Sequence, residues 1–353
     1  MTGYFNHSAL NAFDKKVSQL ADNFDSKYDA EVVFYLTRGC NLACPGCYMN
    51  KGKVCKAKDF IPADDVHYYI NEFSNLDNYN EAAVFSGGEI FTTPVKYLEH
   101  TIQGALDYQI RAHLKTNGQW ITDKNKSDEI LQMLSGLRAP LLMDAEDPLV
   151  NEYFSRYSPE YIKSHWSKIL ETLRREHLVR NSLDLCVSVD DKIHPAQSAK
   201  WFTNIAEKIS SNSKLSRKIA LKSFSFTDSY EFFMRGVIRN SHVSNVDFNY
   251  DTQICSFSFN DMPIYSWFGD FINITPTCDP NDIGDIALPS DSGRARLVFF
   301  FYPDGTAGFE TMGYKSVGRV PYKTRGGEYK DFNRLFSDMR RALVNDYSRA
   351  ISR

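Results

Sequence analysis

The stretch from Glu31 to Asn50 reads EVVFYLTRGCNLACPGCYMN, and it decides which fold and which chemistry the rest of the chain must support. Its first eight residues, Glu31–Arg38, are rich in β-branched and aromatic side chains, which is typical of a buried strand. The expected strand runs directly into a loop that holds three cysteines in the pattern C-x3-C-x2-C: Cys40, Cys44 and Cys47. A strand followed by such a loop predicts a metal site at the strand's carboxyl end.

Three cysteines at this spacing favour an iron–sulfur cluster with one open iron. A [4Fe–4S] cluster has four irons, and ordinary ferredoxins ligate each of them with a cysteine. A fourth iron left free can bind a ligand through an amino and a carboxylate group. The alternative is a zinc site that takes Cys55 or a histidine as its fourth ligand, but zinc sites usually use two C-x2-C pairs and the chain has no second pair. A chance grouping of loop thiols is a third interpretation.

Strands and helices are expected to alternate after the cysteine loop. Strands are predicted over 82–86, 111–115, 183–189 and 219–224, and helices over 63–76, 94–108, 124–136 and 195–210. This alternation predicts an α/β fold, with a parallel sheet and helices outside it. Residues 1–30 are expected to form a helical segment. Residues 140–180 interrupt the alternation and are interpreted as a helical insertion.

Polar clusters follow three of these expected strands. Ser86-Gly87-Gly88-Glu89 ends one strand, Thr116-Asn117-Gly118 the next, and Ser188-Val189-Asp190 a later one. Barrel-type α/β enzymes place their chemistry on loops at the carboxyl ends of strands. Glycines let the backbone approach a ligand closely, and a carboxylate suits an ammonium group. The three clusters therefore mark a candidate active site around the cysteine loop.

With these motifs in this order, the sequence resembles the radical S-adenosylmethionine (SAM) superfamily over roughly residues 31–225. The resemblance implies a partial (β/α)6-type barrel with a [4Fe–4S] cluster on the three cysteines and SAM on the open iron. It further implies that Glu89 pairs with the methionine amino group of SAM. The other implied SAM contacts are Ser86, Gly87, Gly88, Asn117, Ser188 and Asp190. The sequence departs from the superfamily at Gly46, where an aromatic residue often stands. Tyr48 is expected to take that place beside the adenine, and a plain packing role for Tyr48 is the alternative.

The resemblance also implies the reaction. One electron, from a donor such as flavodoxin or ferredoxin, cleaves SAM to a 5′-deoxyadenosyl radical, which abstracts hydrogen from a peptide or other natural-product substrate. Oxidation, crosslinking or epimerisation would follow. The alternatives are an activase for a glycyl-radical enzyme and a non-catalytic iron–sulfur protein. Activases are generally compact, so the long C-terminal region argues against the first, and the complete set of motifs argues against the second.

The expected domains are residues 1–30, the barrel over 31–250 and an α+β extension over 251–353. The segment FFFYPDGTAGFETMGYKSVGRV (299–320) resembles the start of an extension that binds auxiliary clusters in many peptide-modifying members, yet no cysteine follows Cys278. The extension is therefore either a substrate-binding cap or a chance likeness around a common Pro-Asp-Gly turn. A final helix is expected from Asp331, with five apolar residues on one face: Phe332, Leu335, Phe336, Met339 and Leu343.

Four further cysteines lie outside the loop: Cys55, Cys186, Cys255 and Cys278. Their spacing shows no pair, which argues against a second cluster. Cys186 falls inside an expected strand and is interpreted as a small buried hydrophobe. Cys255 lies beyond the barrel motifs and is the candidate hydrogen donor for an epimerase, with a buried structural thiol as the alternative.

Composition excludes several classes of protein. The formal net charge is -3 and the estimated pI is about 6.3, so we expect no nucleic-acid partner. The most apolar run, residues 297–302, is far too short to span a bilayer, and the N-terminus lacks the apolar core of a signal peptide. Clustered cysteines suit a reducing compartment. We therefore expect a cytoplasmic protein without membrane contact that acts on a small molecule or a peptide.

Overall fold

The computed structural model describes much of the chain, with gaps. The described residues are 28–42, 60–137, 141–146, 183–189, 195–210, 219–225, 235–237, 239, 243–249, 254–259, 262–267, 288–289, 295–311 and 315–351. Most of the expected N-terminal helical segment lies outside them. The three residues of that segment that are described, 28–30, belong to a strand.

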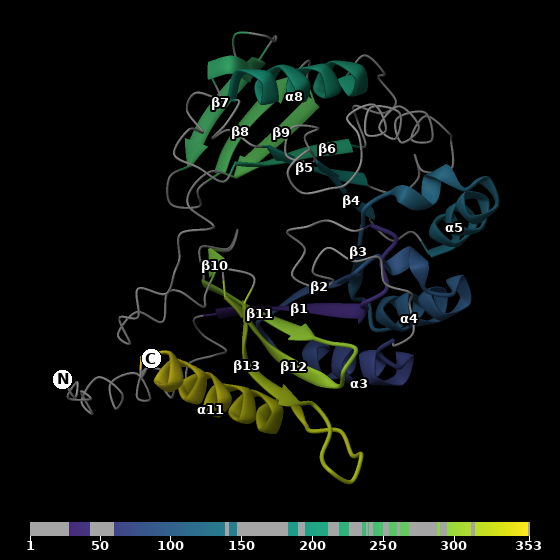
Figure 1. Ribbon diagram of the computed structural model, residues 1–353, viewed down its shortest axis with the longest axis vertical. Helices are drawn as coiled ribbons and strands as arrows, with labels where there is room; N and C mark the ends of the chain where they lie inside the picture. Colours follow the sequence, from purple (N-terminus) through teal and green to yellow (C-terminus); the bar gives the residue numbers. More distant parts are fainter. Residues whose placement is uncertain are drawn as a thin grey trace.

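Six parallel strands form the centre of one sheet and follow one another in chain order (Figure 1). They are β1 (Tyr28–Thr37), β2 (Tyr79–Gly87), β3 (Arg111–Thr116), β4 (Leu141–Glu146), β5 (Leu183–Val189) and β6 (Ile219–Ser225). Six parallel strands in sequence order are the sheet of a partial (β/α)6 barrel. The fold class predicted from the alternation of strands and helices is confirmed.

Helices connect these strands and pack on one face of the sheet. They are α3 (Ala63–Ser74), α4 (Val95–Asp107), α5 (Lys124–Leu137) and α8 (Pro195–Ser210), each within two residues of its predicted bounds. In Figure 1, α3, α4 and α5 lie in a row beside β1, β2 and β3. Their apolar residues recur every three or four positions, so one stripe of each helix faces the sheet. On α3 that stripe buries Val66, Tyr69, Ile70 and Phe73.

Strand β4 corrects one prediction. Residues 140–180 were expected to form a helical insertion, but Leu141–Glu146 is a strand that pairs with β3 on one side and with β5 on the other. The sequence LLMDAE holds good helix formers and no β-branched residue, so its local propensity favours a helix. Pairing with two neighbouring strands overrides that weak preference. Residues 147–180 of the segment lie outside the described part of the chain.

The later part of the chain adds strands to both edges of this sheet. At one edge β9 (Met262–Trp267) pairs in parallel with β6, followed outward by β8 (Ile254–Phe259) and β7 (Val243–Asn249). At the other edge β11 (Ala295–Phe301) pairs in parallel with β1, followed outward by β12 (Thr306–Thr311) and β13 (Lys315–Pro321). A two-residue strand, β10 (Leu288–Pro289), pairs with β11. Described strands from both expected domains, 31–250 and 251–353, thus belong to one continuous sheet.

The final helix, α11 (Phe332–Ile351), closes the core at the β11 edge. Its five predicted core residues are all buried, which confirms the expected apolar face. Phe299 of β11 packs its ring against Phe73 of α3 and against Phe332 and Phe336 of α11. The C-terminal elements therefore belong to the same core as the first barrel strands. Among the helices of the described residues, none is long and apolar enough to cross a membrane.

Candidate active site

The cysteine loop starts and ends at the carboxyl end of β1. Thr37, the last residue of β1, forms an antiparallel bridge with Phe60, and the amide of Ile61 donates to the carbonyl of Leu36 at 3.0 Å. Thr37 and Phe60, on either side of the cysteine motif, therefore lie side by side. Cys44, Cys47 and Tyr48 fall within this loop and lie outside the described residues, so their predicted roles remain predictions.

Of the three predicted cluster ligands, Cys40 is the one that lies within the described residues. Its side chain is buried, and the amide of Leu42 donates to Cys40 Sγ at 3.4 Å. The preceding residue is also fixed, because the amide of Gly39 donates to the hydroxyl of Thr37 at 2.9 Å. An amide that donates to a cysteine sulfur stabilises its thiolate, and hydrogen bonds of this kind tune iron–sulfur clusters. The surroundings of Cys40 therefore fit a cluster ligand.

The two glycines after β2 lie directly against the start of the cysteine loop. The amide of Gly88 donates to the carbonyl of Thr37 at 2.8 Å, and the amide of Glu89 donates to the carbonyl of Gly39 at 2.7 Å. Gly87 has a φ of +136°, a conformation that side chains disfavour. A Cβ on Gly88 would lie 2.2 Å from the carbonyl oxygen of Gly39. Glycine at both positions is thus a packing requirement of the contact with the loop.

The Glu89 carboxylate is buried, with a relative exposure of 2% for the residue, and is held by three donors. Oε1 accepts from the hydroxyl of Thr116 at 2.7 Å and from the amide of Phe91 at 3.1 Å. Oε2 accepts from the amide of Asn117 at 2.7 Å. Charge-assisted bonds of this kind are among the stronger ones in proteins. They fix the carboxylate between the ends of β2 and β3.

Asn117 links the end of β3 back to the cysteine loop. Its side-chain amide donates to Oδ1 of Asn41 at 3.0 Å, while its own Oδ1 accepts from the amide of Gln119 at 2.9 Å. The next residue, Gly118, has a φ of +74° and lets the chain turn sharply there. The carboxyl ends of β1, β2 and β3 are therefore joined by hydrogen bonds around Cys40.

The structure brings one group of the predicted site residues together around Cys40, and the others lie in later strands or outside the described residues. Ser86, Gly87, Gly88, Glu89 and Asn117 lie at the strand ends around Cys40. Ser188 lies in β5, where it pairs with Glu146 of β4 and Phe224 of β6, while Asp190 falls outside the described residues. Cys255 lies in β8, and β9 stands between that strand and β6.

Sequence reasoning missed an ion cluster that links the cysteine loop to the hairpin between β11 and β12. Asp304 Oδ2 accepts from Arg38 at 2.8 Å and from Arg319 of β13 at 2.6 Å. Arg319 also lies 4.0 Å above the ring of Tyr302. Burial opposes ionisation of Asp304, but hydrogen bonds from Thr306 and the charges of Arg319 and Arg38 outweigh it and lower the pKa of this carboxyl. The Pro-Asp-Gly turn was noted in the sequence, but its contact with Arg38 depends on β11 lying beside β1.

Residues 30–145 match the family model described as a 4Fe-4S single cluster domain. The matched span includes Cys40, Cys44, Cys47 and the polar ends of β2 and β3. The predicted [4Fe–4S] cofactor is thereby confirmed. No curated protein sequence matches the chain.

Several solved structures resemble the chain. The crystal structure of Streptococcus suis SuiB bound to precursor peptide SuiA is 12% identical, covers 92% of this chain and 70% of its own, and has a TM-score of 0.52. SuiB bound to S-adenosylmethionine is 11% identical, covers 85% and 67%, and has a TM-score of 0.48. Native anSMEcpe with bound AdoMet is 11% identical, covers 89% and 82%, and also has a TM-score of 0.48. The first of these matches establishes a shared fold.

Proposed function

We propose that this chain, a member of the radical SAM superfamily, is an enzyme that cleaves SAM reductively and modifies a peptide. Its membership rests on the single-cluster domain, on the order of the motifs along the chain and on the shared fold. The alternatives of a zinc site and of a chance grouping of thiols have no comparable support.

The observation that carries the proposal is the attachment of the Glu89 segment to the cysteine loop. The Glu89 amide is bonded to Gly39, the residue before Cys40, and the Glu89 carboxylate is bonded to Asn117. This arrangement fixes a buried carboxylate close to the first cluster ligand. A ligand that carries an amino group and binds the open iron would meet a carboxylate there.

The residues would divide the work as follows. Cys40, Cys44 and Cys47 would hold the cluster, which when reduced supplies the electron that splits SAM into methionine and the hydrogen-abstracting 5′-deoxyadenosyl radical. Glu89 would accept from the amino group of SAM. Around it, Ser86, Gly87, Gly88 and Asn117 would shape the pocket from the ends of β2 and β3. Ser188, Asp190 and Tyr48 remain proposed contacts to the ribose, carboxylate and adenine of SAM.

A peptide is the substrate class we favour. SuiB, whose complex with its precursor peptide has the same fold as this chain, is the support for that choice. We favour an oxidative outcome over epimerisation, because a thiol donor requires a cysteine placed at the substrate. The electron donor would be a flavodoxin or ferredoxin. A cytoplasmic location follows from the need to keep the cluster reduced.

The test is anaerobic reconstitution followed by reduction. We expect about four irons per chain, since three thiolates in one loop hold one cluster. Dithionite and SAM should then release 5′-deoxyadenosine slowly, even without substrate. Changing Cys40, Cys44 or Cys47 to Ala should abolish both signals, whereas Cys55→Ala should leave them unchanged. Bound zinc in place of iron, or cluster loss in the Cys55 variant, would contradict the proposal.

A further inference from the structure

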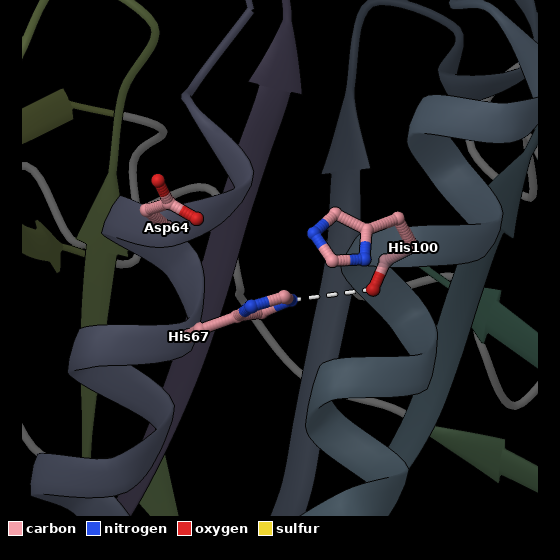
Figure 2. Close-up of side chains that lie close together, drawn as sticks. All are labelled: Asp64, His67 and His100. Atoms are coloured by element: carbon pink, nitrogen blue, oxygen red, sulfur yellow. Dashed lines mark hydrogen bonds between the residues drawn. The ribbon is translucent and has the colours of Figure 1, made fainter.

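Three side chains of the kinds that bind metals gather on helices α3 and α4. Asp64 and His67 lie on α3 and His100 lies on α4 (Figure 2). One ligand atom from each of them lies within 4.8 Å of the other two. Spacing of three residues places Asp64 and His67 on the same face of α3. This group, which we call the α3–α4 histidine cluster, has no role in the proposed SAM chemistry.

His67 is held in an orientation that suits a metal ligand. Its Nε2 lies 3.2 Å from the backbone carbonyl of His100, the contact drawn in Figure 2. A carbonyl oxygen only accepts, so Nε2 carries the proton, and in the neutral ring Nδ1 then has the lone pair. Histidines that bind metals commonly donate their other ring N–H to a carbonyl or carboxylate, which fixes the ring and its tautomer.

Gly104 of α4 makes room for this imidazole. A Cβ at that position would lie 2.1 Å from Nε2 of His67, which is far too close for any side chain. The ring also meets that of His100 edge to face, with 5.0 Å between the two centroids. The position of His67 is therefore set by the backbone and packing of α4. Asp64 and His100 are exposed, so their side chains can adjust.

We propose that Asp64, His67 and His100 bind a divalent transition metal of the zinc type and so join α3 to α4. Two imidazoles and one carboxylate are a ligand set that Zn²⁺ accepts, with a fourth position left for water. Ligands about 2.1 Å from a tetrahedral ion lie about 3.4 Å apart. The three ligand atoms lie within 4.8 Å of one another, so only a small inward shift of the two exposed side chains is needed. Rotation about their side-chain bonds suffices for such a shift.

Bound metal would stabilise the two helices that flank the cluster site. Helix α3 follows the cysteine loop and α4 follows the Glu89 segment, so the ion would connect the elements behind both. A ligand that binds only the folded state stabilises it in proportion to the logarithm of its concentration over its Kd. The inference stands on these residues alone and does not depend on SAM cleavage.

The experiment is a calorimetric titration of the reconstituted holoprotein with ZnCl₂. Iron content is measured before and after, so that zinc in the cysteine loop is detected as lost iron. We expect one zinc per chain with no iron released. His100→Ala and Asp64→Asn alter exposed side chains, and each should weaken binding at least about tenfold, the lower end of what even an outer-shell partner contributes to a metal site. His67→Ala should do the same.

Two matched variants serve as controls. His113→Ala removes an imidazole from β3, and Glu99→Gln removes an exposed carboxylate from α4, both outside the cluster. Each should bind zinc as the wild type does. Zinc binding that persists in His100→Ala and in His67→Ala would overturn the proposal, as would binding that disappears in His113→Ala. Wild-type protein that binds no zinc would overturn it as well.

Discussion

At Gly88 the end of β2 lies directly against the start of the cysteine loop. Because a Cβ there would lie 2.2 Å from the Gly39 carbonyl and 2.8 Å from that of Arg38, any side chain must push the loop away. We therefore expect Gly88→Ala to retain clearly less iron after reconstitution than wild type.

Gly136 is the matched control for this change. It lies in α5, and a Cβ added to it would meet nothing within 4 Å. Gly136→Ala should keep the full iron content and gain up to about 1 kcal/mol of stability from its helix propensity. Equal iron content in Gly88→Ala and wild type would show that the loop does not need this close contact.

Glu89→Gln tests the proposed contact with SAM while it keeps the shape of the side chain. An amide can still accept at one atom but carries no charge to pair with an ammonium group. A hydrogen bond to a charged group typically contributes about 1.5–3 kcal/mol, so SAM affinity should fall roughly ten- to a hundredfold. The cluster should remain, because its ligands are unchanged, and binding can be measured by equilibrium dialysis.

Thr116→Val separates orientation of the carboxylate from its charge. This variant removes the hydroxyl that donates to Glu89 Oε1 at 2.7 Å but leaves the charge in place. SAM affinity should fall by less than in Glu89→Gln. If Glu89→Gln binds SAM as wild type does, the role assigned to Glu89 is wrong, whatever Thr116→Val shows.

At the scale of elements, the hairpin between β11 and β12 is tied to the cysteine loop by Asp304. Arg38 is both a partner of Asp304 and a near neighbour of Cys40 in the chain. Exposed ion pairs contribute about 0.2–1 kcal/mol each, so global stability should change little in Asp304→Ala. The loop should open more often, and the cluster absorbance should decay up to about fivefold faster in air. Asp247→Ala, an exposed change in β7, should decay as wild type does.

The lowered pKa of Asp304 sets the pH range of this effect. Because the carboxyl pKa is depressed, the stabilisation from the Asp304 ion pairs is fully present above the ordinary pKa of about 3.9. It is lost as the pH falls through the lowered pKa of Asp304. The ratio of decay rates between Asp304→Ala and wild type should therefore be the same at pH 6 and at pH 8. A ratio that falls toward one between these two values would contradict the assignment.

Elements with strong local patterns could be predicted from the sequence, and those that depend on distant partners could not. The Glu31–Arg38 strand and the apolar face of α11 are evident because their residue types and spacing match the structure they form. Strand β4 was missed because LLMDAE lacks strand-forming residues. The pairing of β11 with β1 involves residues more than 250 positions apart, and no local pattern encodes it.

The candidate site divides in the same way. The cysteine spacing and the Gly87-Gly88-Glu89 motif could be identified from the sequence as parts of a candidate active site. The partners Thr116 and Asn41 were not assigned, although a polar residue at the buried end of a strand was the available signal for Thr116. The α3–α4 histidine cluster forms only when two helices pack side by side. Spacing along the chain therefore indicates that Asp64 and His67 share a helix face, but it does not place His100 beside them.

At the scale of the whole molecule, the C-terminal region is fastened to the first barrel helix by a buried carboxylate. Asp65 of α3 accepts from the hydroxyls of Tyr322 at 2.9 Å and Tyr329 at 2.7 Å, and Lys323 lies 2.8 Å from it. Burial and the neighbouring Asp65 charge raise the pKa of Tyr322, which keeps this hydroxyl a donor at neutral pH. Residues that follow the barrel motifs in the sequence thus cover and stabilise the β1 side of the sheet.

Cys255 lies near the opposite edge of the sheet, in β8. Whether it donates a hydrogen atom decides the fate of the substrate radical. In an epimerisation the substrate loses one hydrogen atom to the 5′-deoxyadenosyl radical and regains one from a thiol, which an electron and a proton must then restore. The product mass is unchanged, and in heavy water the product gains one deuteron, because thiols exchange with solvent. In an oxidation the substrate radical instead gives up a proton to solvent and an electron to a one-electron acceptor such as an oxidised flavodoxin or ferredoxin. The product is then lighter by about two mass units, by hydrogen counting within the general radical scheme.

We expect the lighter product, because Cys255 lies in β8 with β9 between it and the barrel strand β6. Cys255→Ala should then leave both 5′-deoxyadenosine release and product mass unchanged. Cys186→Ala, an equivalent change in β5, serves as the control for loss of a strand thiol. A product of unchanged mass that carries one deuteron, and that disappears in Cys255→Ala but not in Cys186→Ala, would instead assign the hydrogen donor to Cys255. The measurement is mass spectrometry of the product formed in ordinary and in heavy water.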